Sequence, residues 1–162
     1  DSPTECLCGI AKDVLNTSDP MKKSELTRAH YANWLKERFS VGYAQMPDQP
    51  KRQEGLQIKD PGRIKRGKGG TLESRVAMIH SLANIEQWAI DLSWDVMGRF
   101  STVKINDKPL PMEFFDDFIK VADDEAKATF CNVERTIGNS GKLFWCIAST
   151  QWFMAVSRRD IL

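Results

Sequence analysis

Two stretches of the sequence decide the fold: residues 72–100, LESRVAMIHSLANIEQWAIDLSWDVMGRF, and residues 110–130, LPMEFFDDFIKVADDEAKATF. In both, apolar residues recur every three or four positions, which is the period of one face of an α-helix. The first stripe comprises Leu72, Val76, Ile79, Leu82, Ala83, Ala89, Ile90, Met97 and Phe100. The second comprises Phe114, Phe115, Phe118, Val121, Ala122 and Phe130. The sequence therefore predicts two long helices joined by a connection at 101–109.

Two glutamates interrupt these stripes, Glu86 in the first and Glu125 in the second. Burying a lone carboxylate is costly, so such a glutamate is usually paired, protonated or bound to metal. Asp91 and Asp95 are predicted to point more than a quarter-turn away from the first stripe. Inward carboxylates on adjacent helices are part of the ligand set of a dinuclear metal site in a four-helix bundle.

The rest of that ligand set is missing. A dinuclear site takes one Glu from each of two helices and Glu-x-x-His from each of two others. Here Ala128 stands at the histidine position three residues after Glu125. His80 lies about 120° from the face of Glu86, and His30 belongs to another element. The alternative is that both glutamates are boundary residues with buried stems and solvated carboxylates.

The N-terminal part predicts two shorter helices, over residues 4–15 and from Pro20 to about Phe39. Ser18 or Asp19 can cap the second helix, and Pro20 suits its first turn. Its expected buried positions are Leu26, Ala29, Trp34 and Leu35. Residues 40–71 lack periodicity and predict a long basic loop. Residues 138–162 fit no template and predict an irregular tail.

Within the loop, residues 51–68 hold an excess of Lys and Arg. They offer candidate phosphate contacts for RNA or an acidic partner: Lys51, Arg52, Lys65, Arg66 and Lys68. The alternative is a solvated connector, because no aromatic residues interleave with the charges.

Length and composition describe an ordinary folded domain. The chain has 162 residues, 41% of them hydrophobic, and a net charge of +1, so neither nucleic acid nor membrane is an expected partner. No apolar run approaches the roughly 18 residues that a membrane span needs. The cysteines Cys6, Cys8, Cys131 and Cys146 predict reduced thiols in an intracellular, cytoplasmic protein. The sequence begins at Asp1, without a signal segment.

The segment Arg66–Phe100 followed by LPMEFFDDFIKVADDEAK resembles the uncharacterised ferritin-like proteins of domain of unknown function four-five-five. The segment LNTSDPMKKSELT resembles the N-terminal helices of that family, so the likeness covers roughly residues 1–127. The resemblance implies an all-α, ferritin-like helical bundle. It also implies that Glu86 and Glu125 match two of the family's carboxylates. Here the bundle would be incomplete, with two N-terminal helices, the first two core helices and an irregular tail.

The chain departs from the family pattern at Asn84, where the family has histidine, and from Ala128 onward. Read one nucleotide later, codons for 133–159 can encode a string similar to the family's continuation. This suggests the hypothesis that residues from about 128 onward are out of frame or that the chain is truncated. The expected division is a helical domain at 1–137 and a divergent tail at 138–162.

Three functions follow as expectations. The first is an incomplete ferritin-like protein, ancestrally a dinuclear metal carboxylate protein, with no competent metal site, no catalytic residue and no cofactor in this form. The second is a diiron- or dimanganese-type oxidase or hydroxylase completed by a homo-oligomer, with iron or manganese held by Glu86 and Glu125. The third is binding of RNA or an acidic partner through 51–68.

Overall fold

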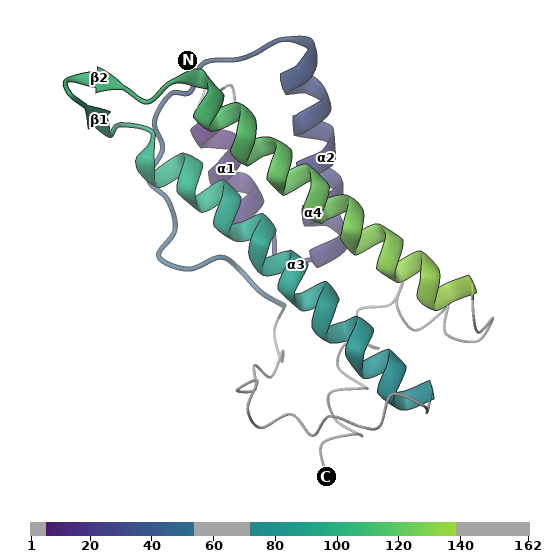
Figure 1. The fold of residues 1–162 in the computed structure, drawn as a ribbon. Coiled ribbons are helices and arrows are strands. Elements are labelled where there is room, and N and C mark those ends of the chain that lie inside the picture. The colour runs from purple at the N-terminus through teal and green to yellow at the C-terminus, as the bar shows by residue number, and fades with distance from the viewer. Residues whose placement is uncertain (1–5, 54–71, 139–162) are drawn as a thin grey trace.

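The described part of the chain is an antiparallel helical hairpin covered on one face by two shorter helices (Figure 1). The computed structural model describes residues 6–53 and 72–138, and side chains within 6–53 and 81–130. The helices are α1 (Leu7–Leu15), α2 (Pro20–Lys36), α3 (Leu72–Phe100) and α4 (Met112–Gly138). Strands β1 (Lys104–Ile105) and β2 (Lys108–Pro109) lie between α3 and α4. The all-α class that the sequence predicts is confirmed.

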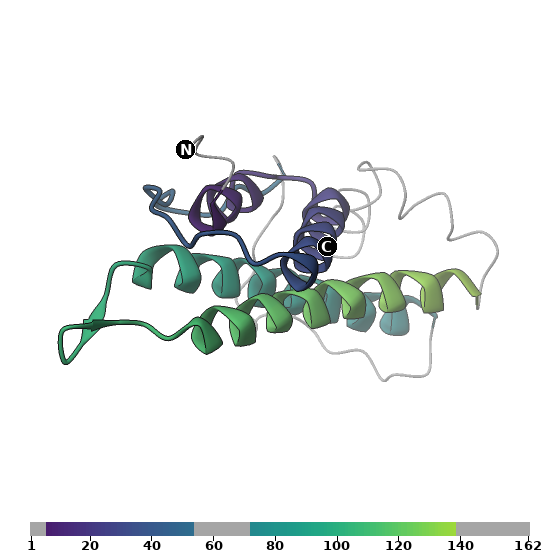
Figure 2. The ribbon, with the colours of Figure 1, turned by 90° about the horizontal axis from the view of Figure 1, so that it is seen from above.

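Figure 2 shows two layers, with α3 and α4 side by side in one and α1 and α2 in the other. The strands between α3 and α4 pair antiparallel, with Lys104 opposite Pro109 and Ile105 opposite Lys108. Asn106 and Asp107 turn the chain with φ of 51° and 62°. A two-residue hairpin needs positive φ at both central residues, and Asn and Asp adopt it at low cost. The sequence predicts a connection at 101–109, and the hairpin within it was not expected.

The N-terminus of α2 forms as its sequence predicts. The Asp19 carboxylate accepts a hydrogen bond of 2.8 Å from the Lys22 backbone N–H, and Pro20 occupies the first turn. The helix ends at Lys36, three residues before the expected end at Phe39.

The loop after α2 wraps α1 and satisfies its helix ends. The backbone N–H groups of Leu7 and Cys8 donate to Ser40 O and Val41 O, at 2.9 and 3.0 Å. The Lys51 N–H donates to Leu15 O at 2.8 Å. Met46 packs against Gly98 of α3, where an added Cβ would lie 2.2 Å from its sulfur. The loop is therefore an integral part of the core.

The core lies between the two layers. Its buried apolar side chains come from α1 (Leu7, Ile10, Val14, Leu15), α2 (Trp34), α3 (Ile90, Trp94, Met97) and α4 (Phe115, Ile119). Cys6 and Cys8 are buried and form no disulfide within the described part of the chain, and the side chains of Cys131 and Cys146 lie outside the described residues. No helix among the described residues is long and apolar enough to cross a membrane.

The expected buried face of α2 was partly wrong. Trp34 is buried and Leu26 partly buried, but Ala29 is exposed and Leu35 is 67% exposed. The face toward α3 instead carries Lys23, Ser24 and Thr27. These polar residues can be buried because each forms a hydrogen bond, which offsets the loss of water.

His30 on α2 predicts a pH dependence of stability. Its ring meets Trp94 edge-on at a centroid distance of 6.5 Å, and burial lowers its pKa from the ordinary 6.5, although Asp13 opposes this effect. On acidification below 6.5, the unfolded chain therefore takes up this proton before the folded chain does. We expect the free energy of unfolding to fall, by at most about 1.4 kcal/mol per pH unit.

Urea unfolding between pH 7 and pH 5 measures this effect. The His30→Gln variant should lose the His30 share of the slope, while His80→Gln serves as the matched control. Equal slopes for wild type and His30→Gln would contradict the assignment.

Candidate functional site

Glu86 and Glu125 occupy equivalent borders on the two long helices. Glu86 lies one turn after Leu82, which is 43% exposed, and one turn before Ile90, which is fully buried. Glu125 lies one turn after Val121, which is 44% exposed, and one turn before the buried Thr129. Both glutamates are half-buried, with one neighbour in the core and one toward solvent.

The two helices touch at the level of these glutamates. Gln87 Nε2, next to Glu86, donates to Thr129 Oγ1 at 3.3 Å. The Thr129 hydroxyl donates to Glu125 O at 3.1 Å, one turn earlier on α4. Four residues of helix rise about 6 Å, so the backbones of residues 86 and 125 lie roughly one turn apart along the hairpin. The structure therefore brings both predicted carboxylate positions into one region.

These residues do not fit a dinuclear metal on their own. Within the described part of the chain, no group of three or more His, Cys, Asp and Glu side chains is arranged to hold a metal ion. Ala128 supplies no ligand, and His30 packs on Trp94 in the other layer. The side chain of His80 lies outside the described residues. A bundle site takes six protein ligands, and Glu86 and Glu125 provide only two of them.

Several large apolar side chains of α3 and α4 are exposed. Figure 2 shows that one side of these two helices faces away from α1 and α2. Ile85 is 61% exposed and Leu92 is 63% exposed. Leu82, Phe100 and Val121 are also exposed. These five residues form what we call the open face. Among the described helices, none covers it, and contiguous exposed apolar surface of this kind marks an interaction site.

Asp91 is the centre of a buried ion cluster. Its carboxylate lies 2.6 Å from Lys23 Nζ on α2 and 2.5 Å from Arg52 Nη2 in the loop. The Arg52 guanidinium also stacks 4.3 Å above the Trp88 ring. Burial raises the pKa of Asp91 and lowers the pKa of Lys23, while the attraction between the two groups opposes both shifts. For both groups burial has the larger effect on the pKa, and the ion pair offsets part of it.

This cluster corrects one sequence expectation and shows where two candidate phosphate contacts lie. Asp91, which was expected to point away from the packed stripe, is 1% exposed. It was missed because α3 packs through two neighbouring faces, and the face toward α2 is polar. Of the candidate phosphate contacts, Arg52 is turned inward onto Asp91, and Lys51 is exposed. Lys65, Arg66 and Lys68 lie outside the described residues.

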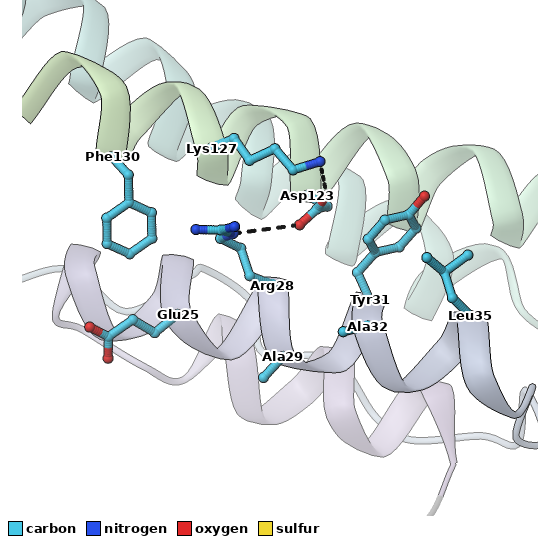
Figure 3. A pocket seen from close by; sticks show the side chains of 9 residues that line it. All are labelled: Glu25, Arg28, Ala29, Tyr31, Ala32, Leu35, Asp123, Lys127 and Phe130. Atoms are coloured by element: carbon cyan, nitrogen blue, oxygen red, sulfur yellow. Dashed lines mark ion pairs between the residues drawn. The ribbon is translucent and has the colours of Figure 1, made fainter. Parts of the chain in front are cut away.

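A groove of about 480 Å³ runs between α2 and α4 (Figure 3). The buried Asp123 carboxylate lies on its α4 side, 2.5 Å from Lys127 and 4.0 Å from Arg28. Arg28 lies over Phe130 at 5.5 Å and Lys127 over Tyr31 at 5.9 Å. In this groove, the Asp123 carboxylate is therefore matched by Lys127 and Arg28, and the ion pair with Arg28 joins α2 to α4.

The fold and these sites define a class of protein: an all-α domain built on a long helical hairpin, with a pair of border carboxylates and an apolar face that no other described helix covers. The family described as "Protein of unknown function (DUF455)" matches residues 16–142, and the chain belongs to that family. The match continues beyond Lys127, where the likeness read from the sequence ended. Searches of curated proteins and of solved structures found no match.

Proposed function

We propose that this chain is a ferritin-like helical domain in which Glu86 and Glu125 form one half of a carboxylate metal site, and that the single chain does not complete that site. The observation that supports this proposal is the shared border position of the two glutamates beside the open face. In a four-helix bundle, two further helices cover such a face and bring the remaining ligands. In this proposal α3 and α4 correspond to the first two core helices of such a bundle.

Metal content of the isolated monomer tests the proposal. After loading with Mn²⁺ and desalting, the monomer should retain well below one metal ion per chain, measured by mass spectrometry of the metal. Two border carboxylates without further ligands hold a divalent ion weakly. Retention of two metal ions per monomer would contradict an incomplete site.

A second copy of the chain is the candidate that would complete the site. Two hairpins that meet through their open faces about a two-fold axis would form a four-helix arrangement with Glu86 and Glu125 from each copy. Four carboxylates without imidazole suit manganese better than tightly held iron. The observation favouring this candidate is that Ile85 and Leu92, the most exposed members of the open face, lie on the same helix as Glu86.

The dimer candidate predicts a particle of twice 18.4 kDa that binds about two metal ions per dimer. Glu125→Ala should remove both ions together, because each bridging carboxylate serves the whole site. Glu113→Ala is the matched control, since Glu113 is exposed in the first turn of the same helix. A dimer that binds no Mn²⁺ would contradict the metal-site candidate, even if it formed through the open face.

A further inference from the structure

A small cavity lies where the start of α2 meets α3 and the wrapping loop. Its volume is about 20 Å³, and its walls include Ser18, Lys23, Arg52, Asn84 and Gln87. A space of this size admits one water-sized group. Ser18 is exposed and Asn84 half-buried, so the rim reaches the surface of the molecule. The remainder of a larger ligand could therefore stay outside while one atom enters.

The described charged groups at the cavity, Lys23, Arg52 and Asp91, carry a net charge of +1. Lys23 and Arg52 share a single carboxylate, Asp91, at 2.6 and 2.5 Å. Lys23 is buried, with 1% of its surface exposed. The Arg52 guanidinium keeps its proton, because an arginine side chain does not lose it in a protein. Lys23 Nζ has three protons and donates to Asp91 Oδ1 and to Lys51 O. One of its protons therefore remains for another acceptor.

Gln87 adds an acceptor whose orientation is fixed by its neighbours. The Ser24 hydroxyl donates to Pro20 O at 2.9 Å, and the Thr129 hydroxyl donates to Glu125 O at 3.1 Å. Both hydroxyl oxygens must then accept from Gln87 Nε2, at 2.9 and 3.3 Å. The amide oxygen consequently points the other way. Among the described residues, this buried oxygen has no hydrogen-bond partner, although Gln87 is only 4% exposed.

The cavity thus combines surplus cationic donors with one buried acceptor. We propose that it binds an oxyanion that carries a proton, such as hydrogen phosphate or a phosphate monoester in its singly protonated form. The P–OH oxygen would enter the cavity, where it would accept from Lys23 Nζ and donate to Gln87 Oε1, while the charged oxygens would stay at the rim beside the Arg52 guanidinium. A water molecule could satisfy Gln87, but it would leave the excess charge uncompensated.

Comparison of phosphate with sulfate tests this inference on the wild-type protein. Calorimetric titration at pH 6.0 and constant ionic strength should show saturable binding of inorganic phosphate. Sulfate has the same shape without a proton at this pH, so it should bind about tenfold more weakly. Equal binding of both anions, or no saturation by phosphate, would overturn the inference. Phenyl phosphate distinguishes a phosphate monoester from the free ion as the ligand. Tighter binding than inorganic phosphate indicates an organic phosphate, and weaker binding indicates the free ion.

Two variants locate the binding site. Arg52→Gln should weaken phosphate binding at least about tenfold, whereas Arg38→Gln, which removes an exposed arginine elsewhere, should not. Gln87→Leu should reduce the preference for phosphate over sulfate. If Gln87→Leu does not fold, Asn84→Ala provides a second change in the cavity wall and should weaken phosphate binding. Undiminished binding in Arg52→Gln would place the anion elsewhere and overturn the assignment.

Discussion

Replacing Asp91 by alanine is expected to destabilise the protein by about 3–5 kcal/mol, because it leaves Lys23 and Arg52 as buried or half-buried cations without a counter-charge. Lys23 loses its one carboxylate partner among the described residues, at 2.6 Å, and Arg52 loses the same carboxylate, at 2.5 Å. A domain of this size is stable by about 5–15 kcal/mol, so the loss is a large part of the total. Urea unfolding followed by circular dichroism measures it.

The exposed pair Lys120–Asp124 on α4 is the control, with an N–O distance of 2.5 Å but open to solvent. Asp124→Ala should change the free energy of unfolding by about 1 kcal/mol or less. A double variant separates charge from packing. If the penalty in Asp91→Leu is that of orphaned cations, adding Lys23→Met should recover much of the lost stability. A double variant no more stable than Asp91→Leu would contradict this explanation.

The long helices could be predicted because their signal is local. The apolar period of 72–100 gave the bounds of α3, and Asp19 followed by Pro20 marked the start of α2. The interface between α2 and α3 could not be predicted in this way. Lys23 and Asp91 are 68 residues apart in sequence, and each alone indicates a solvated position. Only the tertiary fold brings the two charges together, so the sequence pattern misplaced Asp91 and gave no indication that Lys23 is buried.

The candidate site likewise contains residues that the sequence indicates and residues that it does not. Glu86 and Glu125 stood out because they interrupt apolar stripes, and the structure places them at matching borders of α3 and α4. Gln87 gave no such signal, because a glutamine beside a stripe is ordinary. Its role depends on Ser24 and Thr129, whose hydroxyl protons are already committed to backbone carbonyls. A hydrogen-bond network of this kind can be found only from the arrangement of donors and acceptors.

Trp94→Ala is expected to cost about 3–5 kcal/mol, because Trp94 is fully buried and joins the two layers. Its Nε1 donates to Thr27 Oγ1 on α2 at 3.0 Å, so alanine would leave both a cavity and a buried hydroxyl without its donor. Trp94→Phe keeps much of the volume and isolates the hydrogen bond, for which a loss of about 1 kcal/mol is expected in addition to any packing change.

Trp88→Ala is the matched control for Trp94→Ala on the same helix. Trp88 is 45% exposed, so its truncation removes far less packing, and it also takes away the surface on which Arg52 stacks. We expect a loss below about 2 kcal/mol. Similar losses for both variants would mean that the layers do not depend on the core between α2 and α3. A large difference would show that the face of α3 toward α2 contributes more to stability than the side of the helix that carries Trp88.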